Sequence, residues 1–443
     1  MLIQNLTNAC IVIKGEKEKI IIDPWFEDGI YLGTWHNFPR VSEKKLINSL
    51  KDVGFCLITH LHKDHFNIET IKKYLKKSTQ FILPKVFGYQ VMLNTLKNNG
   101  FNHVEILDCG VTLFETNEFS IRSIEPLNTS GLIDITKNEL SIDAGFSVYS
   151  KKHNKKLIFL ADNNLYDVDK VKKNIDLLDS PDLIAFSYSC FASDYPFKYK
   201  FSDEEMVEIC NSLEEIRFNK QIKCLHLIKP KNILVYSNEF IPVHEHSKKW
   251  MEIFPRIWTS NKFSVAERYA VTSLATGYAM YPDDSLEINN NGDFVPNINE
   301  IDNIELYREM IEYADSIKLD NYYNQFSDDN ISADEIIDLL KKASLNYKNA
   351  LIRNNLSPSQ VLNFMSDDIY LGSISIDGEF FNHGSAEIDS KSLYIDCELF
   401  ILKKILLNQE HWNDASLSMR ISWDRIPNVY CSDTLNALNY LRN

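Results

Sequence analysis

Short apolar runs alternate with amphipathic segments along the first 240 residues or so of the chain. The runs "ACIVIKG" and "KIIIDPWF" predict two strands joined by a polar turn. The run "FCLITH" is continuously apolar, which indicates a strand buried on both faces. The segment "NIETIKKYLKK" that follows has Ile68, Ile71 and Leu75 at helical spacing, with lysines on the other side. This alternation predicts a layered α/β domain.

Further along, the runs "FSIRSIE", "GFSVYS", "KLIFLAD" and "DLIAFSYS" predict a second group of strands. The helix "SDEEMVEICNSLEEIRF" and the strand "NILVYS" come after them. Near residue 283 the composition becomes acidic and rich in asparagine, which indicates a loop or linker. Because 443 residues exceed one ordinary core, we expect two regions: residues 1–282, and an accessory region 283–443 that is helical and then mixed α/β.

Composition narrows the class of protein. The formal charge is −15, from 47 basic and 62 acidic residues, which argues against a nucleic-acid surface. The chain starts directly with a strand-like pattern instead of a secretory leader, and no apolar run approaches the roughly 20 residues of a membrane span. Its eight cysteines form neither C-x-x-C nor C-x-H, which excludes a zinc ribbon or a Rieske site among these residues. We therefore expect a cytoplasmic protein with a small-molecule substrate and no membrane or nucleic-acid partner.

The stretch "ITHLHKDHFN", residues 58–67, is here called the histidine loop. It holds three of the 11 histidines of the chain in six positions, as His60, His62 and His65, together with Asp64. It lies where a buried strand ends and a helix begins. Imidazoles suit zinc and iron, and a carboxylate adds a hard oxygen ligand, so the loop predicts a site for one or two divalent metal ions. A polar loop with three surface histidines is the plainer alternative, but it does not account for the spacing or the acidic partner.

The pattern H-x-H-x-D-H after an apolar strand resembles the signature of the metallo-β-lactamase fold superfamily. The resemblance implies a four-layer αββα sandwich with metals at one edge and a C-terminal α+β accessory unit. It also implies a supporting role for Asp23, at the end of "KIIIDPWF", and a metal-bridging role for Asp162, at the end of "KLIFLAD".

Several other stretches resemble the metallo-β-lactamase-like domain of CMP-N-acetylneuraminate hydroxylases. They include "DPWFEDGIYLGTWHNFP", "FSYSCFASDYPFKY", "LIKPKNILVYSNEFIPVHEHSKKW" and "WNDASLSMRISWDRIPNVY". The chain departs from those enzymes in lacking a Rieske motif, so a redox reaction would need an external electron donor or a different iron chemistry.

Two histidines of the superfamily pattern are also absent. No histidine lies between His103 and His153, where a third motif would supply one. The candidates there are Asp143, which we favour, Glu125 and Asn128. The strand "NILVYS" ends in serine where a fifth motif would supply a histidine, so we expect His244, in preference to His246, to take that place.

These features leave three functional hypotheses. In the first, a metal-dependent hydrolase uses a metal-bound hydroxide on an ester, lactone or phosphodiester, with Asp64 as general base. Its metal ligands are His60, His62, Asp64, His65, Asp143, Asp162 and His244. In the second, an iron-dependent oxygenase hydroxylates a small molecule or sugar nucleotide; in the third, the site is degenerate and only binds. The C-terminal unit is expected either to close over the site or to mediate assembly of a homo-oligomer.

Overall fold

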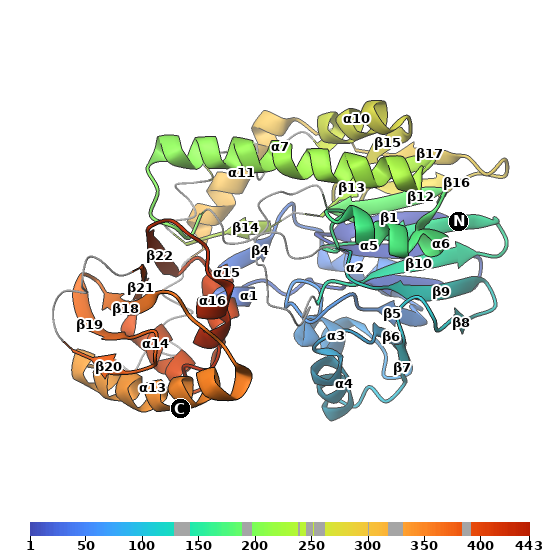
Figure 1. Ribbon diagram of the computed structural model, residues 1–443. Helices are drawn as coiled ribbons and strands as arrows, with labels where there is room; N and C mark the ends of the chain where they lie inside the picture. Colours follow the sequence, from blue (N-terminus) through green and yellow to red (C-terminus); the bar gives the residue numbers. More distant parts are fainter. Residues whose placement is uncertain are drawn as a thin grey trace.

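The computed structural model describes residues 1–127, 142–187, 197–237, 240–244, 251, 262–299, 301–317, 331–382 and 391–443. Within them two large sheets face each other, and a smaller α+β unit lies beside them (Figure 1). The four-layer αββα sandwich with a C-terminal accessory unit is therefore confirmed.

The first sheet has eight strands and carries the histidine loop at one edge. Its order is β17 (Phe294–Asn297), β16 (Ser285–Ile288), β1 (Leu2–Thr7), β2 (Cys10–Lys14), β3 (Lys19–Ile22), β5 (Phe55–Leu57), β6 (Gln80–Pro84) and β7 (Val104–Leu107). Helices α2 (Glu43–Leu50), α3 (Ile68–Tyr74) and α4 (Tyr89–Asn98) cover its outer face, where apolar side chains from sheet and helices form one core cluster. Strands β3, β5, β6 and β7 run parallel, so their carboxyl ends meet at the same edge.

The second sheet has seven strands in the order β15 (Thr276–Ala279), β13 (Asn232–Tyr236), β12 (Leu183–Ser187), β11 (Lys155–Phe159), β10 (Gly145–Ser150), β9 (Phe119–Ile124) and β8 (Phe114–Glu115). Helices α5 (Val168–Lys173), α6 (Ile175–Leu178), α7 (Asp203–Ile228) and α10 (Lys262–Ser273) lie on its outer side. The inner faces of the two sheets share a core of fully buried isoleucine, leucine and phenylalanine side chains, among them Ile11, Phe146 and Phe159. This core fixes the relative positions of the strand ends, one group in each sheet, that carry the site.

The acidic, asparagine-rich stretch after residue 282 is not a linker. Its residues form β16 and β17, and β16 pairs with β1 at the edge of the first sheet. Ile288 and Phe294 are buried, whereas Glu287 and Val295 point to solvent. An edge hairpin with one solvated face has few apolar residues, which is why its composition resembles that of a loop. The first sheet therefore extends past the boundary expected at residues 282 and 283.

Helix α7 is longer than the sequence pattern predicts. It begins at a capping box formed by Ser202 and Glu205 and continues to Ile228, ten residues beyond the expected end. Met206 and Cys210 of its first half pack in a cluster with α1 (Ile30–Gly33), β4 (Trp35–Asn37), β14 (Phe240–Pro242) and α11 (Asn303–Ser316). Its second half packs on the second sheet. Helix α7 thus spans the sandwich and the region next to the C-terminal unit (Figure 1).

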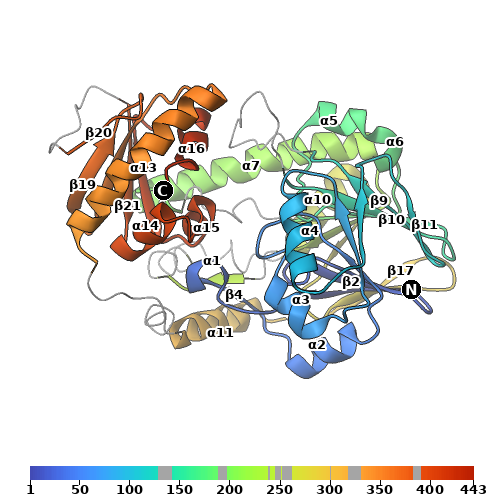
Figure 2. The same cartoon turned by 90° about the horizontal axis from the view of Figure 1, so that it is seen from below.

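The C-terminal unit has its own sheet and its own core. The sheet order is β20 (Phe380–Phe381), β19 (Ile369–Ile374), β18 (Val361–Ser366), β21 (Ser392–Cys397) and β22 (Ile421–Ile426). Helices α13 (Ala333–Asn354), α14 (Leu399–Leu406), α15 (Trp412–Leu417) and α16 (Ser432–Leu438) complete it. The short α1 lies between this unit and the sandwich in both views (Figures 1 and 2), and it contacts α15.

Candidate metal centre

The histidine loop begins where β5 ends and leads into α3. Asn67 caps α3 by accepting a hydrogen bond from the backbone N–H of Thr70, which fixes the exit of the loop. Within the loop, the backbone N–H groups of His65 and Phe66 both donate to the carbonyl of His62, at 3.0 and 2.7 Å. This tight turn folds the chain back, so that His65 returns to the position of His60, with ring centroids 4.1 Å apart.

Asp23 supports the loop from the end of the neighbouring strand, β3. Its fully buried carboxylate accepts hydrogen bonds from the backbone N–H of Thr59 at 2.7 Å and from the Thr59 hydroxyl at 2.6 Å. It also lies 2.9 Å from Nδ1 of His65. Burial raises the pKa of Asp23 above its ordinary value, and the neighbouring His65 opposes that shift. These contacts place Asp23 where the sequence predicted a support for the loop.

This network also fixes which ring nitrogen of two histidines faces inward. The Thr59 hydroxyl gives its single proton to Asp23, so in its 3.0 Å contact with Nδ1 of His60 it must be the acceptor. His60 therefore carries a proton on Nδ1 and directs the lone pair of Nε2 away from Thr59. His65 likewise donates from Nδ1 to Asp23. Both rings thus present Nε2 for ligation, as metal-binding histidines with a hydrogen-bonded Nδ1 commonly do.

Two groups of side chains converge on this edge, and Asp162 belongs to both. His60, His62 and Asp162 each offer one ligand atom, and these three atoms lie within 4.8 Å of one another. The same holds for Asp64, His65 and Asp162. Asp162 follows β11 in the second sheet, so the two sheets meet at the site. We call these five residues the His/Asp cluster.

The donor chemistry of the His/Asp cluster fits metal ions. Nε2 of His65 is buried and makes no hydrogen bond, although Oδ2 of Asp64 and Oδ2 of Asp162 lie only 3.2 and 3.3 Å away. Burial alone would lower the pKa of His65, but Asp64, Asp162 and Asp23 together raise it well above its ordinary value. Burial would likewise raise the pKa of Asp64, but His65 lowers it to about 2. The carboxylates therefore favour positive charge at the point that Nε2 faces, which a metal cation supplies.

The expected third-motif and fifth-motif residues lie at different distances from the cluster. Oδ1 of Asp143 is 3.8 Å from Nε2 of His60, so this carboxylate reaches the edge of the site. Glu125 instead accepts from Asn174 and pairs with Lys173, away from the cluster. His244 follows β14 and is half-buried, and it belongs to neither convergent group. Asn128 and His246 lie outside the described residues.

Two tyrosines that no sequence pattern indicated position residues of the cluster. The Tyr31 hydroxyl donates to Oδ1 of Asp64 at 2.6 Å and accepts from the backbone N–H of Lys63 at 3.1 Å. The Tyr236 hydroxyl accepts from the backbone N–H of Ala161, whose φ of 48° sets the turn before Asp162. Tyr31 is 33 residues from Asp64 and Tyr236 is 75 residues from Ala161, so no local motif could have indicated either contact.

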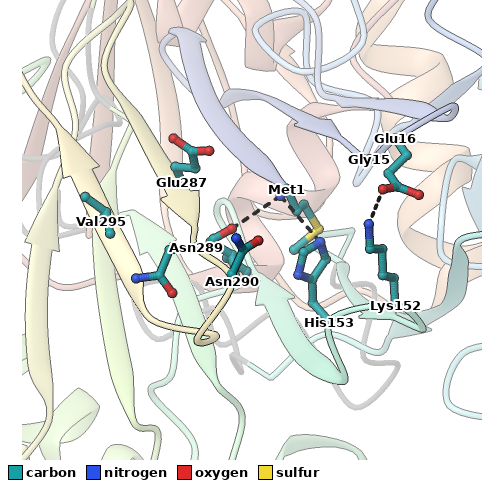
Figure 3. Close-up of a pocket in the computed structure, with 10 residues that line it drawn as sticks. Met1, Gly15, Glu16, Lys152, His153, Glu287, Asn289, Asn290 and Val295 are labelled. Atoms are coloured by element: carbon teal, nitrogen blue, oxygen red, sulfur yellow. Dashed lines mark hydrogen bonds and ion pairs between the residues drawn. The ribbon is translucent and has the colours of Figure 1, made fainter.

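A separate surface pocket lies away from this cluster (Figure 3). It is lined by Met1, Gly15, Glu16, Lys152, His153, Glu287, Ile288, Asn289, Asn290 and Val295. His153 Nε2 lies 3.4 Å from the amino group of Met1, and Lys152 pairs with Glu16. None of the five cluster residues lines this pocket, so we place the candidate chemistry at the strand ends and not in it.

Comparisons with known proteins agree with this fold. Residues 18–220 match the profile of a family described as "Beta-lactamase superfamily domain". A protein of Mycolicibacterium smegmatis that is named as a Rieske 2Fe-2S iron–sulfur protein is 32% identical over 84 residues. That match covers 19% of this chain and 16% of the relative. The UPF0173 protein YddR of Bacillus subtilis is 29% identical over 147 residues, which cover 30% of this chain and 55% of YddR.

Solved structures share low identity with the chain. CmlA, a diiron β-hydroxylase of Streptomyces venezuelae, is 14% identical, with a TM-score of 0.45, over 65% of this chain and 54% of CmlA. Igni18, a metallo hydrolase of Ignicoccus hospitalis, is 12% identical, with a TM-score of 0.40, over 68% of this chain and 99% of Igni18. No helix among the described residues is both long and apolar enough to cross a membrane.

Proposed function

We propose that this chain, whose residues 18–220 match the profile of the beta-lactamase superfamily domain, is a metal-dependent hydrolase of the metallo-β-lactamase fold superfamily. The observation that carries the proposal is the shared position of Asp162. One carboxylate common to two groups of ligand atoms suits a pair of metal ions held close together. His60 and His62 would hold one ion with Asp162, and Asp64 and His65 would hold the other.

When bound, such a metal pair activates water and polarises a substrate oxygen. The side chains of this chain fix where that can happen. Asp23 and Thr59 orient His60 and His65, and Tyr31 fixes one oxygen of Asp64, which leaves the other facing His65. Because Tyr31 occupies one oxygen of Asp64 and the other lies near the point that Nε2 of His65 faces, we propose a ligand role for Asp64 in place of the general-base role expected from the sequence.

The test is elemental analysis of protein purified without added metal and without air, with an absorption spectrum before and after oxygen. We expect about two zinc ions per chain and no response to oxygen. His62→Ala and Asp162→Ala should each lower the metal content. Asp182→Ala should not, because Asp182 directly precedes β12, at the end of that strand away from the proposed metal centre. An unchanged metal content in His62→Ala would overturn the ligand assignment. Zinc-loaded protein would then be screened with lactones, esters and phosphodiesters.

An iron-dependent oxygenase is the second candidate, and a specific observation favours it. Asp143, a carboxylate, reaches within 3.8 Å of His60 where an imidazole would be expected. An additional anionic ligand favours iron in its higher oxidation states. About two irons per chain with an oxygen-dependent spectrum would favour this candidate and start a search for an external electron donor. Protein that takes up neither metal would favour the degenerate binding site.

A further inference from the structure

The C-terminal unit contacts the histidine loop through helix α15. Lys63, the residue after His62, pairs with Asp414 at 2.6 Å and with Glu410 at 3.7 Å. Next to these contacts, the indole N–H of Trp35 donates to the carbonyl of Leu417 at 2.8 Å. The α1 turn that carries Tyr31 lies beside α15 (Figure 2), and the Tyr31 hydroxyl contacts Asp64 and Lys63 of the histidine loop.

One of these contacts reaches a predicted metal ligand directly. The side-chain amide of Asn413, in the first turn of α15, lies 3.4 Å from Nε2 of His62. The other ring nitrogen of His62, Nδ1, lies 3.0 Å from Nε2 of His60 and so faces the cluster. His62 thus has one nitrogen directed at the proposed centre and the other at the C-terminal unit, 351 residues away in the sequence.

We propose that Asn413 is a positioning residue for His62, so that α15 of the C-terminal unit completes the proposed metal centre. The inference rests on the proposed function, because it concerns how one of its ligands is held. His60 and His65 obtain their support from Asp23 and Thr59 inside the sandwich. His62 is half-buried, and in the described part of the chain the polar group facing its outer nitrogen is Asn413.

An amide suits this position because it can serve either tautomer of the imidazole. When Nδ1 carries the proton, that N–H is directed to His60, and Nε2 accepts from the NH₂ group of Asn413. When Nδ1 is a metal ligand, the proton is on Nε2, and the carbonyl oxygen of Asn413 can accept it after a half-turn of the amide. The imidazole plane is the same in both cases, so Asn413 keeps Nδ1 directed at the cluster.

The decisive experiment compares zinc affinities of full-length variants by competition with a chromophoric chelator. Asn413→Leu retains volume and offers no hydrogen bond, so we expect zinc to bind about 10- to 100-fold more weakly, as is typical when a hydrogen-bond partner of a ligand is lost. Asn413→Asp offers only acceptors and should keep the affinity at or above that of the original chain. Because the Asn413 side chain is exposed, neither change should disturb folding.

Two matched controls separate this role from general effects on the C-terminal unit. Asn346→Leu makes the same substitution at an exposed position of α13. Asp414→Asn weakens the ion pair with Lys63 and leaves the amide–imidazole contact in place. Both should bind zinc as the original chain does. A second readout, the ¹⁵N chemical shifts of His62, should move in Asn413→Leu and not in the controls.

The outcomes distinguish the two proposals. If the original chain takes up no metal, the proposed function fails and this inference fails with it. If the original chain binds zinc and Asn413→Leu binds it equally well, the metal centre stands and the role of Asn413 is wrong. If Asp414→Asn weakens binding as much as Asn413→Leu does, docking of the whole unit matters and the specific amide contact does not.

Discussion

The sandwich and the C-terminal unit hold the histidine loop in different ways. On the sandwich side, Asp23 is fully buried and contacts Thr59 and His65 at 2.6 to 2.9 Å. It holds His60 indirectly, through the Thr59 hydroxyl that lies 3.0 Å from Nδ1 of that ring. On the other side, α15 meets the loop through an ion pair between half-exposed side chains and through one contact of 3.4 Å from the exposed amide of Asn413. From this difference we infer that the sandwich holds the proposed metal centre rigidly. The C-terminal unit orients a single ligand, His62, and can influence the centre through that ligand.

Among the substitutions that test this difference, we expect the largest loss of stability from the removal of the Asp23 carboxylate. Asp23→Ala leaves the N–H and hydroxyl of Thr59 and Nδ1 of His65 buried without their acceptor. We expect the free energy of unfolding to fall by about 3–5 kcal/mol, as when one partner of a buried charged network is removed, and metal content to fall with it. Denaturant unfolding of chelated protein and elemental analysis measure the two effects.

Asp23→Asn is the matched control for that substitution. Asparagine keeps the volume and tolerates the positive φ of 48° at this position, but its amide retains only one acceptor oxygen. Its effect should therefore be clearly smaller than that of alanine. Equal losses in the two variants would mean that the negative charge of the Asp23 carboxylate matters more than the one acceptor oxygen that asparagine retains.

A smaller effect is expected where the α1 turn meets the loop. Tyr31→Phe removes the 2.6 Å hydrogen bond to Asp64 and leaves the backbone N–H of Lys63 without its acceptor. The loss should be about 1–3 kcal/mol of unfolding free energy, the cost of an unsatisfied buried group. Metal at the Asp64–His65 position should weaken more than metal at the His60–His62 position. Stepwise zinc titration resolves the two, and equal weakening of both would contradict the pairing of ligands given above.

Trp35→Phe tests the docking of the C-terminal unit without touching the loop. It removes the hydrogen bond from the indole N–H to the carbonyl of Leu417 and keeps an aromatic ring that can stack on Phe240. We expect the free energy of unfolding to fall by about 1 kcal/mol, the net value of one hydrogen bond, and the zinc affinity to stay unchanged. A large loss of zinc affinity would mean that docking and ligand orientation cannot be separated.

The support of the histidine loop that comes from neighbouring strand ends could be predicted from the sequence. Asp23 and the histidine loop end two parallel strands that lie side by side, an arrangement that agrees with the supporting role implied by the resemblance to the superfamily. The same resemblance indicated Asp162, a carboxylate that follows a strand of the facing sheet. The layered architecture followed from the alternation of apolar runs, whereas the edge hairpin β16–β17 was missed because one of its faces is polar.

The support from α1 and from the C-terminal unit depends on contacts between residues far apart in the sequence, which no local pattern predicts. Tyr31 reaches Asp64 from a four-residue turn with positive φ at Tyr31 and Leu32, which the sequence offers no way to place. Asn413 lies in the stretch "WNDASLSMRISWDRIPNVY", whose resemblance to a hydroxylase segment assigns it no role, and only the packing of the C-terminal unit brings it to His62. Asp143 remains a prediction at the margin of the site, because a single carboxylate beside a strand does not determine its own direction.

The smallest expected effect is a change of acid stability on substitution of Asp182, which lies in the sandwich far from the site. This substitution tests whether stability can change while metal binding does not. The pKa of Asp182 lies below its ordinary value: burial opposes this shift, but the backbone N–H of Lys156 and the ammonium of Lys231 outweigh it. A carboxylate whose folded pKa is depressed contributes stability above its unfolded pKa, and that contribution is lost as the pH falls through the folded value. Acid unfolding below about pH 4 should therefore be less steep in Asp182→Asn than in the original chain. Zinc affinity at neutral pH should be the same in both. If Asp182→Asn lowered zinc affinity, the rigidity of the sandwich would extend to the centre over a longer range than the Asp23 network, and the division between the two supports of the histidine loop would be wrong.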